Sequence, residues 1–317
     1  MNFIHSHNRN NNFKQTTLRN KLYFSGVGIH NGKAVSMSIE PGEPNTGVIF
    51  ERTDIKQNNI IKAVIDNVET TCLCTKITNK KGVSVSTIEH LMAAFNGLNI
   101  DNVKVKINAP ELPALDGSSH DYTQKILNSG IKFQNYDRKY IKILKKIKVE
   151  ENNRYISVEP SEKLSLKISI DYPDTIIGNS EILYNHSQND FVKDLSKART
   201  FTLIEDVKKM RLAGYAMGGN INNAIVVDKY NIVNSDGLRI DKEFVKHKAL
   251  DCIGDFYLFG MPLIGLVNTL APGHKLNQMF VKEVLSNKDN YSIENLEMIN
   301  VSNQYINELS NNNYSKD

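Results

Sequence analysis

The stretch HKALDCIGD, at residues 247–255, combines side chains that could bind a cation with the spacing of a helix. Residues four apart lie on one face of an α-helix, so His247, Asp251 and Asp255 are expected to share a face, with apolar residues opposite. A neutral imidazole and a carboxylate one turn apart can hold one metal ion. The alternative is a His–Asp ion pair on a solvated helix face, which is the more common use of this spacing.

A second chemically active group lies in STIEHLM, residues 86–92, at the start of a predicted helix. Glu89 followed directly by His90 suits a proton-accepting carboxylate beside a metal ligand. Ser86 and Glu89 also have the spacing of a capping box, in which Glu89 would only satisfy the backbone of the helix N-terminus. His90 precedes an apolar run and could equally be a hydrogen-bonded core histidine.

Three shorter motifs place polar residues at turns. His274 follows a Pro-Gly turn at the start of a predicted helix, where the helix dipole disfavours a protonated imidazole unless a carboxylate holds it. It could equally be a surface-turn histidine. Thr200 in ARTF could donate a hydrogen bond to a developing oxyanion, or be an ordinary strand or capping residue. The segment PELPALDGSS, residues 110–119, is turn-rich and is interpreted as a connector.

The elements that must position these residues are mostly strands. Period-two alternation of apolar residues predicts strands at 35–39, 103–107 and 164–170, and a short apolar run predicts a buried strand at 224–227. Strands and helices come in clusters without a strict βαβ alternation, which favours an α+β fold. Helical spacing and stop signals predict helices over residues 87–96, 122–127, 203–212, 244–260 and 275–285.

Length and composition indicate a globular chain with two domains, since 317 residues with 40% hydrophobic content can bury a large core. The polar stretch 134–139 is interpreted as a linker. The segments on its two sides are each strand-rich and then yield a helix that carries a histidine, as a duplication would. We predict a disordered tail at 1–13, α+β domains at 14–134 and 139–305, and a flexible tail at 306–317.

Charge and cysteine content narrow the class of protein. The net charge of +4 is spread along the chain without a basic arm, which gives no argument for nucleic acid and suits a small phosphate-bearing substrate. Three cysteines in a chain of this length indicate a reducing compartment. The sequence has no apolar run long enough for a membrane span and no signal-peptide core at its start, so we expect a cytoplasmic protein.

Taken together and in order, the motifs resemble one family, the UDP-3-O-acyl-N-acetylglucosamine deacetylases, which are zinc hydrolases of lipid A synthesis. The resemblance spans residues 14–286, and so many motifs in one order make it specific. The matching segments are GVGIHNGK (26–33), NTGVIFERTD (45–54), STIEHLMAAFNGLNIDN (86–102), NAPELPALDGSS (108–119), ARTF (198–201), NAIVVD (223–228), HKALDCIGDFYLFG (247–260) and GHKLN (273–277).

The resemblance implies an α+β fold of two similar sheet-plus-helix domains, stacked as a layered sandwich with helices inside and the active site between the domains. It also implies a small β-α-β insert at about 202–228 that forms a tunnel for an acyl chain. Ile204, Met210, Leu212 and Met217 could supply the apolar wall of that tunnel. Neither the acyl chain length nor the uridine contacts follow from a local motif.

The resemblance also implies a metal centre with one Zn²⁺ per chain. It places the ligands at His90, His247 and Asp251. Two histidines and one carboxylate leave a fourth position for water, as in catalytic zinc sites. These ligand types do not distinguish zinc from iron.

Catalytic roles follow from the same resemblance. Glu89 would be the general base toward a water molecule whose pKa the metal lowers. Thr200 would stabilise the tetrahedral oxyanion and contact the substrate. His274, held as an imidazolium by Asp255, would stabilise charge or protonate the leaving amine. Lys248 would contact the substrate near its diphosphate.

The implied reaction is hydrolysis of the N-acetyl group of UDP-3-O-(3-hydroxyacyl)-N-acetylglucosamine, which releases acetate in an early committed step of lipid A biosynthesis. We expect a monomer that binds this UDP-linked acylated glucosamine and no nucleic acid. Three alternatives are a non-catalytic nucleotide-sugar or lipid-carrier binding module, a basic nucleic-acid-binding protein, and a zinc deacetylase for another N-acetyl sugar.

Overall fold

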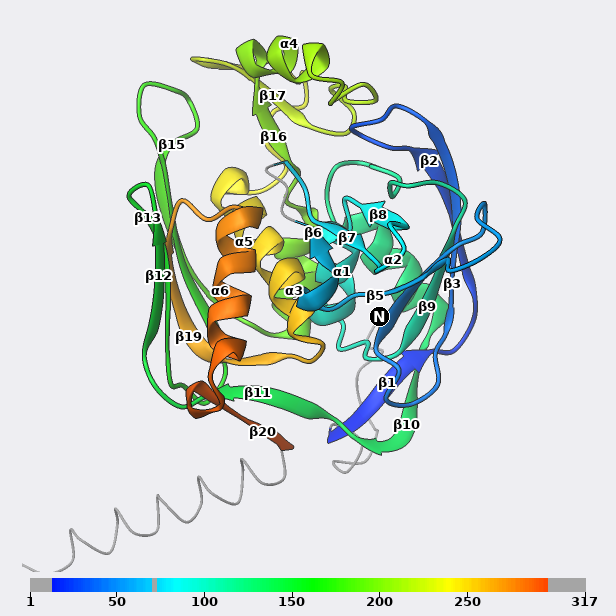
Figure 1. Ribbon diagram of the computed structural model, residues 1–317. Helices are drawn as coiled ribbons and strands as arrows, with labels where there is room; N and C mark the ends of the chain where they lie inside the picture. Colours follow the sequence, from blue (N-terminus) through cyan, green and yellow to red (C-terminus); the bar gives the residue numbers. More distant parts are fainter. Residues whose placement is uncertain (1–12, 70–72, 296–317) are drawn as a thin grey trace, which may run out of the picture.

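Two large sheets form the outer layers of the molecule, and most of the helices lie between them (Figure 1). The structure is a computed structural model that describes residues 13–69 and 73–295. Apart from residue 13, the predicted tails at 1–13 and 306–317 lie outside the described residues. The predicted α+β class is confirmed by this arrangement of antiparallel-rich sheets and packed helices.

One outer layer is a five-stranded sheet. The predicted strands at 35–39 and 103–107 are confirmed, since β3 and β9 bury alternate apolar residues as an amphipathic strand must. The strand order is β2 (Leu22–Val27), β3 (Ala34–Pro41), β9 (Val103–Ile107), β4 (Val48–Arg52) and β5 (Ile60–Lys62). Two smaller sheets consist of β1 (Lys14–Leu18) with β10 (Ile131–Asp137), and of β6 (Val68–Glu69), β7 (Lys76–Thr78) and β8 (Ser84–Ser86).

The other outer layer is a seven-stranded sheet. The predicted strand at 164–170 is confirmed as part of β14 (Leu164–Tyr172), which pairs with β15 (Gly178–Asn185) on one side and β19 (Leu263–Leu270) on the other. The remaining path runs β12 (Ile147–Glu151), β13 (Arg154–Glu159), β19, β11 (Lys139–Ile143) and β20 (Tyr291–Asn295).

Within residues 13–69 and 73–295, all five predicted helices are present, with ends shifted by a few residues, and a sixth helix was missed. The missed helix α3 has only six residues and one buried apolar side chain, too little to show helical periodicity. The predicted helix at 244–260 ends earlier, at Phe256, and continues as a short 3-10 helix. The helices are α1 (Glu89–Gly97), α2 (His120–Ser129), α3 (Gln188–Lys193), α4 (Ile204–Leu212), α5 (Glu243–Phe256) and α6 (His274–Ser286).

Helices α1 and α5 approach each other closely at Gly254. A Cβ atom at this position would lie 2.1 Å from the backbone oxygen of Glu89, so no other residue fits without moving a helix. The side chain of Asn96 donates to the Ile253 carbonyl at 2.9 Å and ties the same two helices together. The contact brings the start of α1 beside the middle of α5.

A small three-stranded unit stands apart from the two large sheets, at the top of Figure 1. Strands β16 (Phe201–Leu203) and β17 (Ile225–Asp228) are parallel and joined through α4, which gives a β-α-β connection where the resemblance places the insert. Strand β18 (Asn231–Ile232) completes this sheet, and β17 contains the predicted strand at 224–227 apart from its first residue. Helix α4 has no buried residue, so one side of it faces solvent and the other faces an open pocket.

The predicted linker at 134–139 is wrong. Strand β10 continues to Asp137, β11 starts two residues later, and the two are separated only by Arg138. Arg138 is buried, and its Nε lies 2.7 Å from Oδ1 of Asp101. Most side chains of β10 are exposed, so no buried apolar alternation marks this strand in the sequence.

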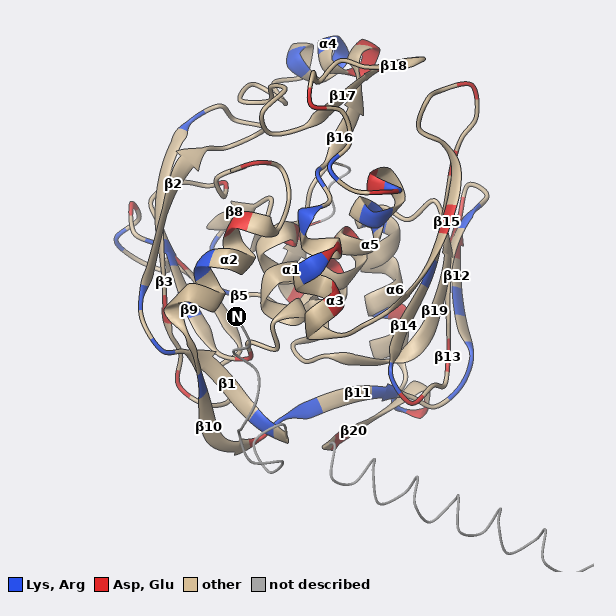
Figure 2. Cartoon of the chain, turned by 180° about the vertical axis from the view of Figure 1, so that it is seen from behind, with Lys and Arg blue, Asp and Glu red and all other residues tan. Residues whose placement is uncertain are grey.

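Apolar side chains form two main clusters, one against each large sheet. The division into folding domains at 14–134 and 139–305 stays a prediction. Basic and acidic residues are interspersed along the outer strands and on α4 (Figure 2). Across the described ranges, none of the helices has the length and apolar character needed to cross a membrane.

Candidate active site

Three side chains from α1 and α5 converge on one point between the two large sheets. Oδ1 of Asp251 lies 3.4 Å from Nε2 of His247 and 3.7 Å from Nε2 of His90. The three possible ligand atoms lie within 4.8 Å of one another. Oδ1 of Asp251 is buried without a hydrogen-bond partner, which is costly for a carboxylate unless a cation binds there. The donor set therefore fits a divalent metal ion of the zinc type.

The orientation of His247 also suits a metal ligand. Its Nδ1 lies 3.0 Å from the backbone oxygen of Ala198, so Nδ1 carries the proton and the lone pair of Nε2 points toward Asp251. Burial lowers the pKa of His247 to about 3, which keeps the imidazole neutral. A neutral ring held by a backbone acceptor is what metal binding requires.

The alternative of a His–Asp pair on a solvated helix face is wrong, because α5 is buried on both faces. Lys248, on the same helix α5, also points toward the metal cluster. The Lys248 ammonium lies 3.0 Å from Oδ2 of Asp251 and 5.4 Å from the centre of the Phe201 ring. Lys248 therefore contacts a residue of the metal cluster, and its contact with substrate stays a prediction.

Glu89 is buried beside this cluster and does not cap its own helix. The N-cap of α1 is Ile88, and the amide of Ser86 donates to the Pro110 carbonyl, so the capping-box interpretation is wrong. Instead, Oε2 of Glu89 accepts a hydrogen bond from the amide of Thr75 at 3.0 Å. Burial raises the pKa of Glu89, which makes its carboxylate a stronger proton acceptor than an exposed one.

His274 and Asp255 form a buried pair on the other side of Glu89, so the surface-turn interpretation of His274 is wrong. Nδ1 of His274 lies 2.8 Å from Oδ2 of Asp255, and Nε2 lies 3.8 Å from Oε1 of Glu89. Burial alone would lower the pKa of His274, but the carboxylates of Asp255 and Glu89 raise it to about 10. At neutral pH this ring is an imidazolium.

Thr200 lies at the wall of the pocket, where β16 begins. Its amide donates to the Gly117 carbonyl at 2.8 Å, and its carbonyl accepts from the Ile225 amide at 2.7 Å. The backbone of Thr200 is therefore fixed between the turn at 116–119 and β17. The side chain is available to the pocket, while its role toward an oxyanion stays a prediction.

Three further residues that hold the site, Thr75, Asn277 and Glu111, were not predicted from the sequence. Thr75 and Asn277 both donate to Asp255, with Asn277 Nδ2 at 2.8 Å from Oδ2. Glu111 is buried and accepts from the amides of His30 and Asn31 at 2.7 and 2.8 Å, so the connector at 110–119 anchors a pocket loop. Glu111 and His30 lie in quoted motifs, whereas Thr75 lies in an irregular stretch without a pattern.

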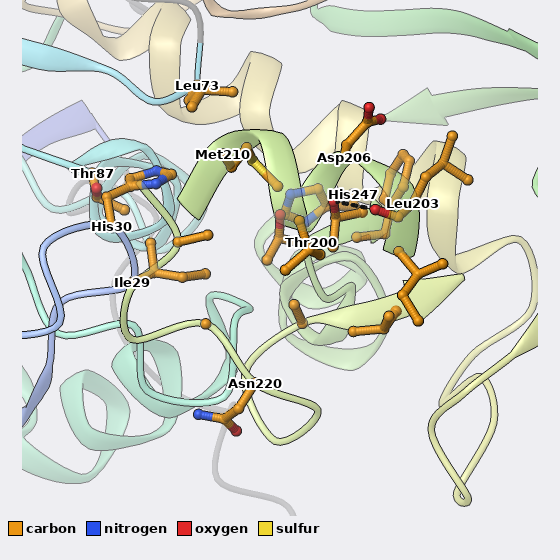
Figure 3. A pocket seen from close by; sticks show the side chains of 18 of the residues that line it. Ile29, His30, Leu73, Thr87, Thr200, Leu203, Asp206, Met210, Asn220 and His247 are labelled. Carbon is orange, nitrogen blue, oxygen red and sulfur yellow. Dashed lines mark hydrogen bonds between the residues drawn. The ribbon is translucent and has the colours of Figure 1, made fainter. Parts of the chain in front are cut away.

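One pocket of about 700 Å³ (Figure 3) is lined by seven of the site residues: Glu89, His90, Thr200, His247, Lys248, Asp251 and His274. Met210 and Asn220 line it from the insert, His30 from the loop after β2, and His247 from α5. Ile204 and Met210 belong to the lining as predicted.

Two residues of the predicted tunnel wall lie elsewhere. Leu212 is 92% exposed at the end of α4, and Met217 is 56% exposed. The backbone around Met217 pairs with the loop after β2, through its amide to the His30 carbonyl at 3.0 Å. Met217 therefore packs on the N-terminal loop near Gly32, and the prediction for both wall residues is wrong.

Three features meet in one largely apolar pocket: a buried carboxylate, an imidazolium near it and a cluster of three possible cation ligands. Groups of these kinds are typical of a hydrolase site. The comparison with known families is more specific. Residues 15–286 match the model of the family UDP-3-O-acyl N-acetylglycosamine deacetylase, and the chain belongs to this family. It is therefore an enzyme that hydrolyses an amide.

Curated relatives agree over nearly their whole length, and each is named UDP-3-O-acyl-N-acetylglucosamine deacetylase. The protein of Wigglesworthia glossinidia brevipalpis is 38% identical over 286 residues, which cover 89% of this chain and 96% of the relative. That of Haemophilus influenzae (strain 86-028NP) is 40% identical over 278 residues, 87% of this chain and 91% of the relative. That of Shewanella frigidimarina (strain NCIMB 400) is 37% identical over 281 residues, covering 88% and 92%.

Proposed function

We propose that the chain removes the N-acetyl group of UDP-3-O-(3-hydroxyacyl)-N-acetylglucosamine, releasing acetate in lipid A biosynthesis, and that it does so with one zinc ion. The observation that carries the proposal is the meeting of the His90–His247–Asp251 cluster with Glu89 and His274 in one pocket. We further propose that the enzyme is a monomer and works in the cytoplasm, where its buried cysteines stay reduced.

The zinc ion would be held by the two imidazole Nε2 atoms and the unpartnered oxygen of Asp251. When bound, it supplies Lewis acidity that lowers the pKa of a water molecule and polarises the amide carbonyl. The Lys248 ammonium beside Oδ2 of Asp251 keeps that carboxylate in place and adds positive charge next to the reacting centre. Lys248 is thus also placed to meet an anionic part of the substrate.

The protein's own acid and base would divide the proton transfers. Glu89 accepts a proton from the attacking water while the oxygen of that water bonds to the acetyl carbon. Thr200 donates its hydroxyl to the oxyanion that forms. The carbon–nitrogen bond then breaks, and the proton on Nε2 of His274 passes to the leaving nitrogen, giving acetate and a free amine. Asp255 keeps His274 charged until that step.

The apolar part of the pocket supports the proposed recognition of an acylated substrate. Apolar side chains of β16, α4 and β17 line its far side, including Ile204, Met210 and Val226. A fatty acyl chain would gain roughly 0.8 kcal/mol for each methylene that it buries there. A substrate without the acyl chain loses this contribution, so the proposed preference separates this enzyme from a deacetylase of simple N-acetyl sugars.

The direct test combines metal analysis with acetate release from the acylated UDP-sugar. We expect about one zinc per chain, and losses of at least ~10³-fold in kcat for Glu89→Ala and His247→Ala. The variant Glu283→Ala changes an exposed glutamate on α6 and should retain full activity. Wild-type activity in both site variants would refute the mechanism, and protein purified without chelator but free of metal would favour a binding module.

A second measurement tests the substrate class. Val226→Trp should fill the apolar side of the pocket and raise KM for the acylated substrate. Any activity of the enzyme on UDP-N-acetylglucosamine should be the same in the variant, because the reacting groups are untouched. Equal losses on both substrates would contradict the assignment of this wall to the acyl chain.

A further inference from the structure

We propose that Thr75 is a positioning residue that fixes the general base and the general acid of this reaction relative to each other. The inference rests on the proposed function, and it concerns a residue to which no role follows from the motifs. Thr75 lies in the irregular stretch just before β7 and is fully buried.

Each polar group of Thr75 is bonded to a part of the site. Its amide donates to Oε2 of Glu89 at 3.0 Å, and its hydroxyl donates to Oδ1 of Asp255 at 2.5 Å. Its carbonyl accepts from the amide of Ile88, at the start of α1, at 3.4 Å. Thr75 therefore bonds to the proposed base Glu89, to Asp255, which holds the proposed acid His274, and to the start of helix α1, which carries Glu89.

The hydroxyl of Thr75 completes the fixation of the Asp255 carboxylate. Oδ2 of Asp255 accepts from Nδ1 of His274 and from Nδ2 of Asn277, both at 2.8 Å. Because Thr75 binds the other oxygen, the carboxylate is held against rotation about its Cβ–Cγ bond. His274 is fixed in turn, with Thr75 Oγ1 only 3.3 Å from its Nδ1.

The consequence lies in the gap between acid and base. Nε2 of His274 and Oε1 of Glu89 are 3.8 Å apart, and both residues are held from behind by Thr75, one directly and one through Asp255. Small misplacements of catalytic groups can cost large factors in rate. Thr75 should thus act on kcat, since its hydrogen bonds go to Glu89 and Asp255 and not to the metal ligands or the apolar wall.

The test is a set of substitutions at this position. Thr75→Val keeps the shape and the amide but removes the hydroxyl, and we expect kcat to fall roughly ten- to a hundredfold, as for loss of a hydrogen bond to a charged group. KM and zinc content should stay within about twofold. Thr75→Ser should restore most of kcat. If the valine variant does not fold, Thr75→Ala gives the same comparison.

A matched control separates position from stability. Thr269 in β19 is also buried, and its hydroxyl donates to the Tyr155 carbonyl at 2.8 Å. Thr269→Val therefore removes a buried hydroxyl that bonds to the backbone of the outer sheet and not to the acid–base pair, so it should leave kcat unchanged. Equal losses of kcat in Thr75→Val and Thr269→Val would overturn the proposal, as would a serine variant no better than valine.

A double-mutant cycle identifies the path through which Thr75 acts. In a His274→Gln background, Thr75→Val should reduce kcat by a clearly smaller factor than in the unmodified enzyme, because the acid that it positions is gone. An identical factor in both backgrounds would overturn an action through Asp255 and His274.

A spectroscopic readout is independent of turnover. The hydrogen-bonded Nδ1 proton of His274 should give a downfield resonance that shifts in Thr75→Val and keeps its position in Thr75→Ser and Thr269→Val. An unshifted resonance in Thr75→Val overturns the role of Thr75 whether or not the substrate is correct. Absence of acetate release by the unmodified zinc-loaded chain would instead refute the proposed function.

Discussion

Glu89 and His274 lie across the active site from each other, with Oε1 and Nε2 3.8 Å apart, although they start two different helices. Burial strengthens Glu89 as a base, and the neighbouring carboxylates keep His274 protonated. In the proposed mechanism, an unprotonated carboxylate beside an imidazolium would supply both proton transfers of the amide hydrolysis. The pair therefore determines how the reaction should depend on pH.

The pH profile of kcat/KM should be bell-shaped. Activity needs Glu89 deprotonated, so it should rise as pH increases through the pKa of Glu89, which burial raises above its ordinary value. Activity also needs His274 protonated, so it should fall as pH increases through a pKa of about 10. Acetate release measured across this range checks both limbs.

Variants assign the limbs of that profile. His274→Gln should lower the rate and remove the alkaline limb, because glutamine does not titrate. Glu89→Gln should lower the rate most strongly and remove the acidic limb. An alkaline limb that persists unchanged in His274→Gln would show that another group controls it.

Removal of the metal should abolish activity and reduce stability together. The carboxylate oxygen of Asp251 that has no partner is stabilised only when a cation binds, so zinc should raise the melting temperature of chelator-treated protein. Activity should return with about one equivalent of zinc. Asp251→Ala should lose both effects, while His120→Ala, outside the pocket, should keep them. A melting temperature insensitive to zinc would contradict the site.

Close packing of helices α1 and α5 at Gly254 should be needed for both stability and activity. A methyl group at position 254 would lie 2.1 Å from the Glu89 backbone oxygen, so Gly254→Ala must push α5 away from α1. We expect a loss of about 1–3 kcal/mol in the free energy of unfolding, measured in urea, and a lower kcat. Gly254→Ser should be worse on both measures, and unchanged kcat in both variants would contradict the argument.

Much of this architecture follows from local patterns in the sequence. Strands such as β9 and β14 alternate because one face is buried, and that alternation is directly readable. The spacing of His247, Asp251 and Asp255 likewise places all three on one face of α5. Local spacing alone did not decide between two interpretations of these residues. A His–Asp ion pair and two ligands of a metal site have the same spacing on a helix.

Contacts between distant segments do not follow from local patterns, and only the family resemblance joined His90 and His274 to this cluster. His90 and His274 complete the site only because α1 and α6 pack against α5. The same packing buries the face of α5 expected to be solvated. Thr75 holds the site from an irregular stretch, where no periodicity marks a residue. The strand β10 was hidden because most of its side chains are exposed instead of filling a core.

Among the charged residues behind the metal cluster, Glu243 should cause the largest loss in the free energy of unfolding when it is substituted. It is fully buried and accepts from the amide and Nε of Arg199, at 3.1 and 2.8 Å, and from the amide of Arg239 at 2.6 Å. Arg199 is itself buried and directly follows Ala198, whose carbonyl orients His247. This arrangement connects the ion pair to the ligand.

Glu243→Ala leaves the Arg199 guanidinium buried without its main partner, so we expect a loss of about 3–5 kcal/mol in the free energy of unfolding and weaker zinc binding. Asp236 contacts the same arginine at 3.1 Å, but its side chain is 59% exposed. Asp236→Ala should therefore cost less than about 1 kcal/mol and leave zinc affinity unchanged. Urea unfolding and zinc titration of both variants check the difference, and equal losses would show that burial of Glu243 is not what makes the pair important.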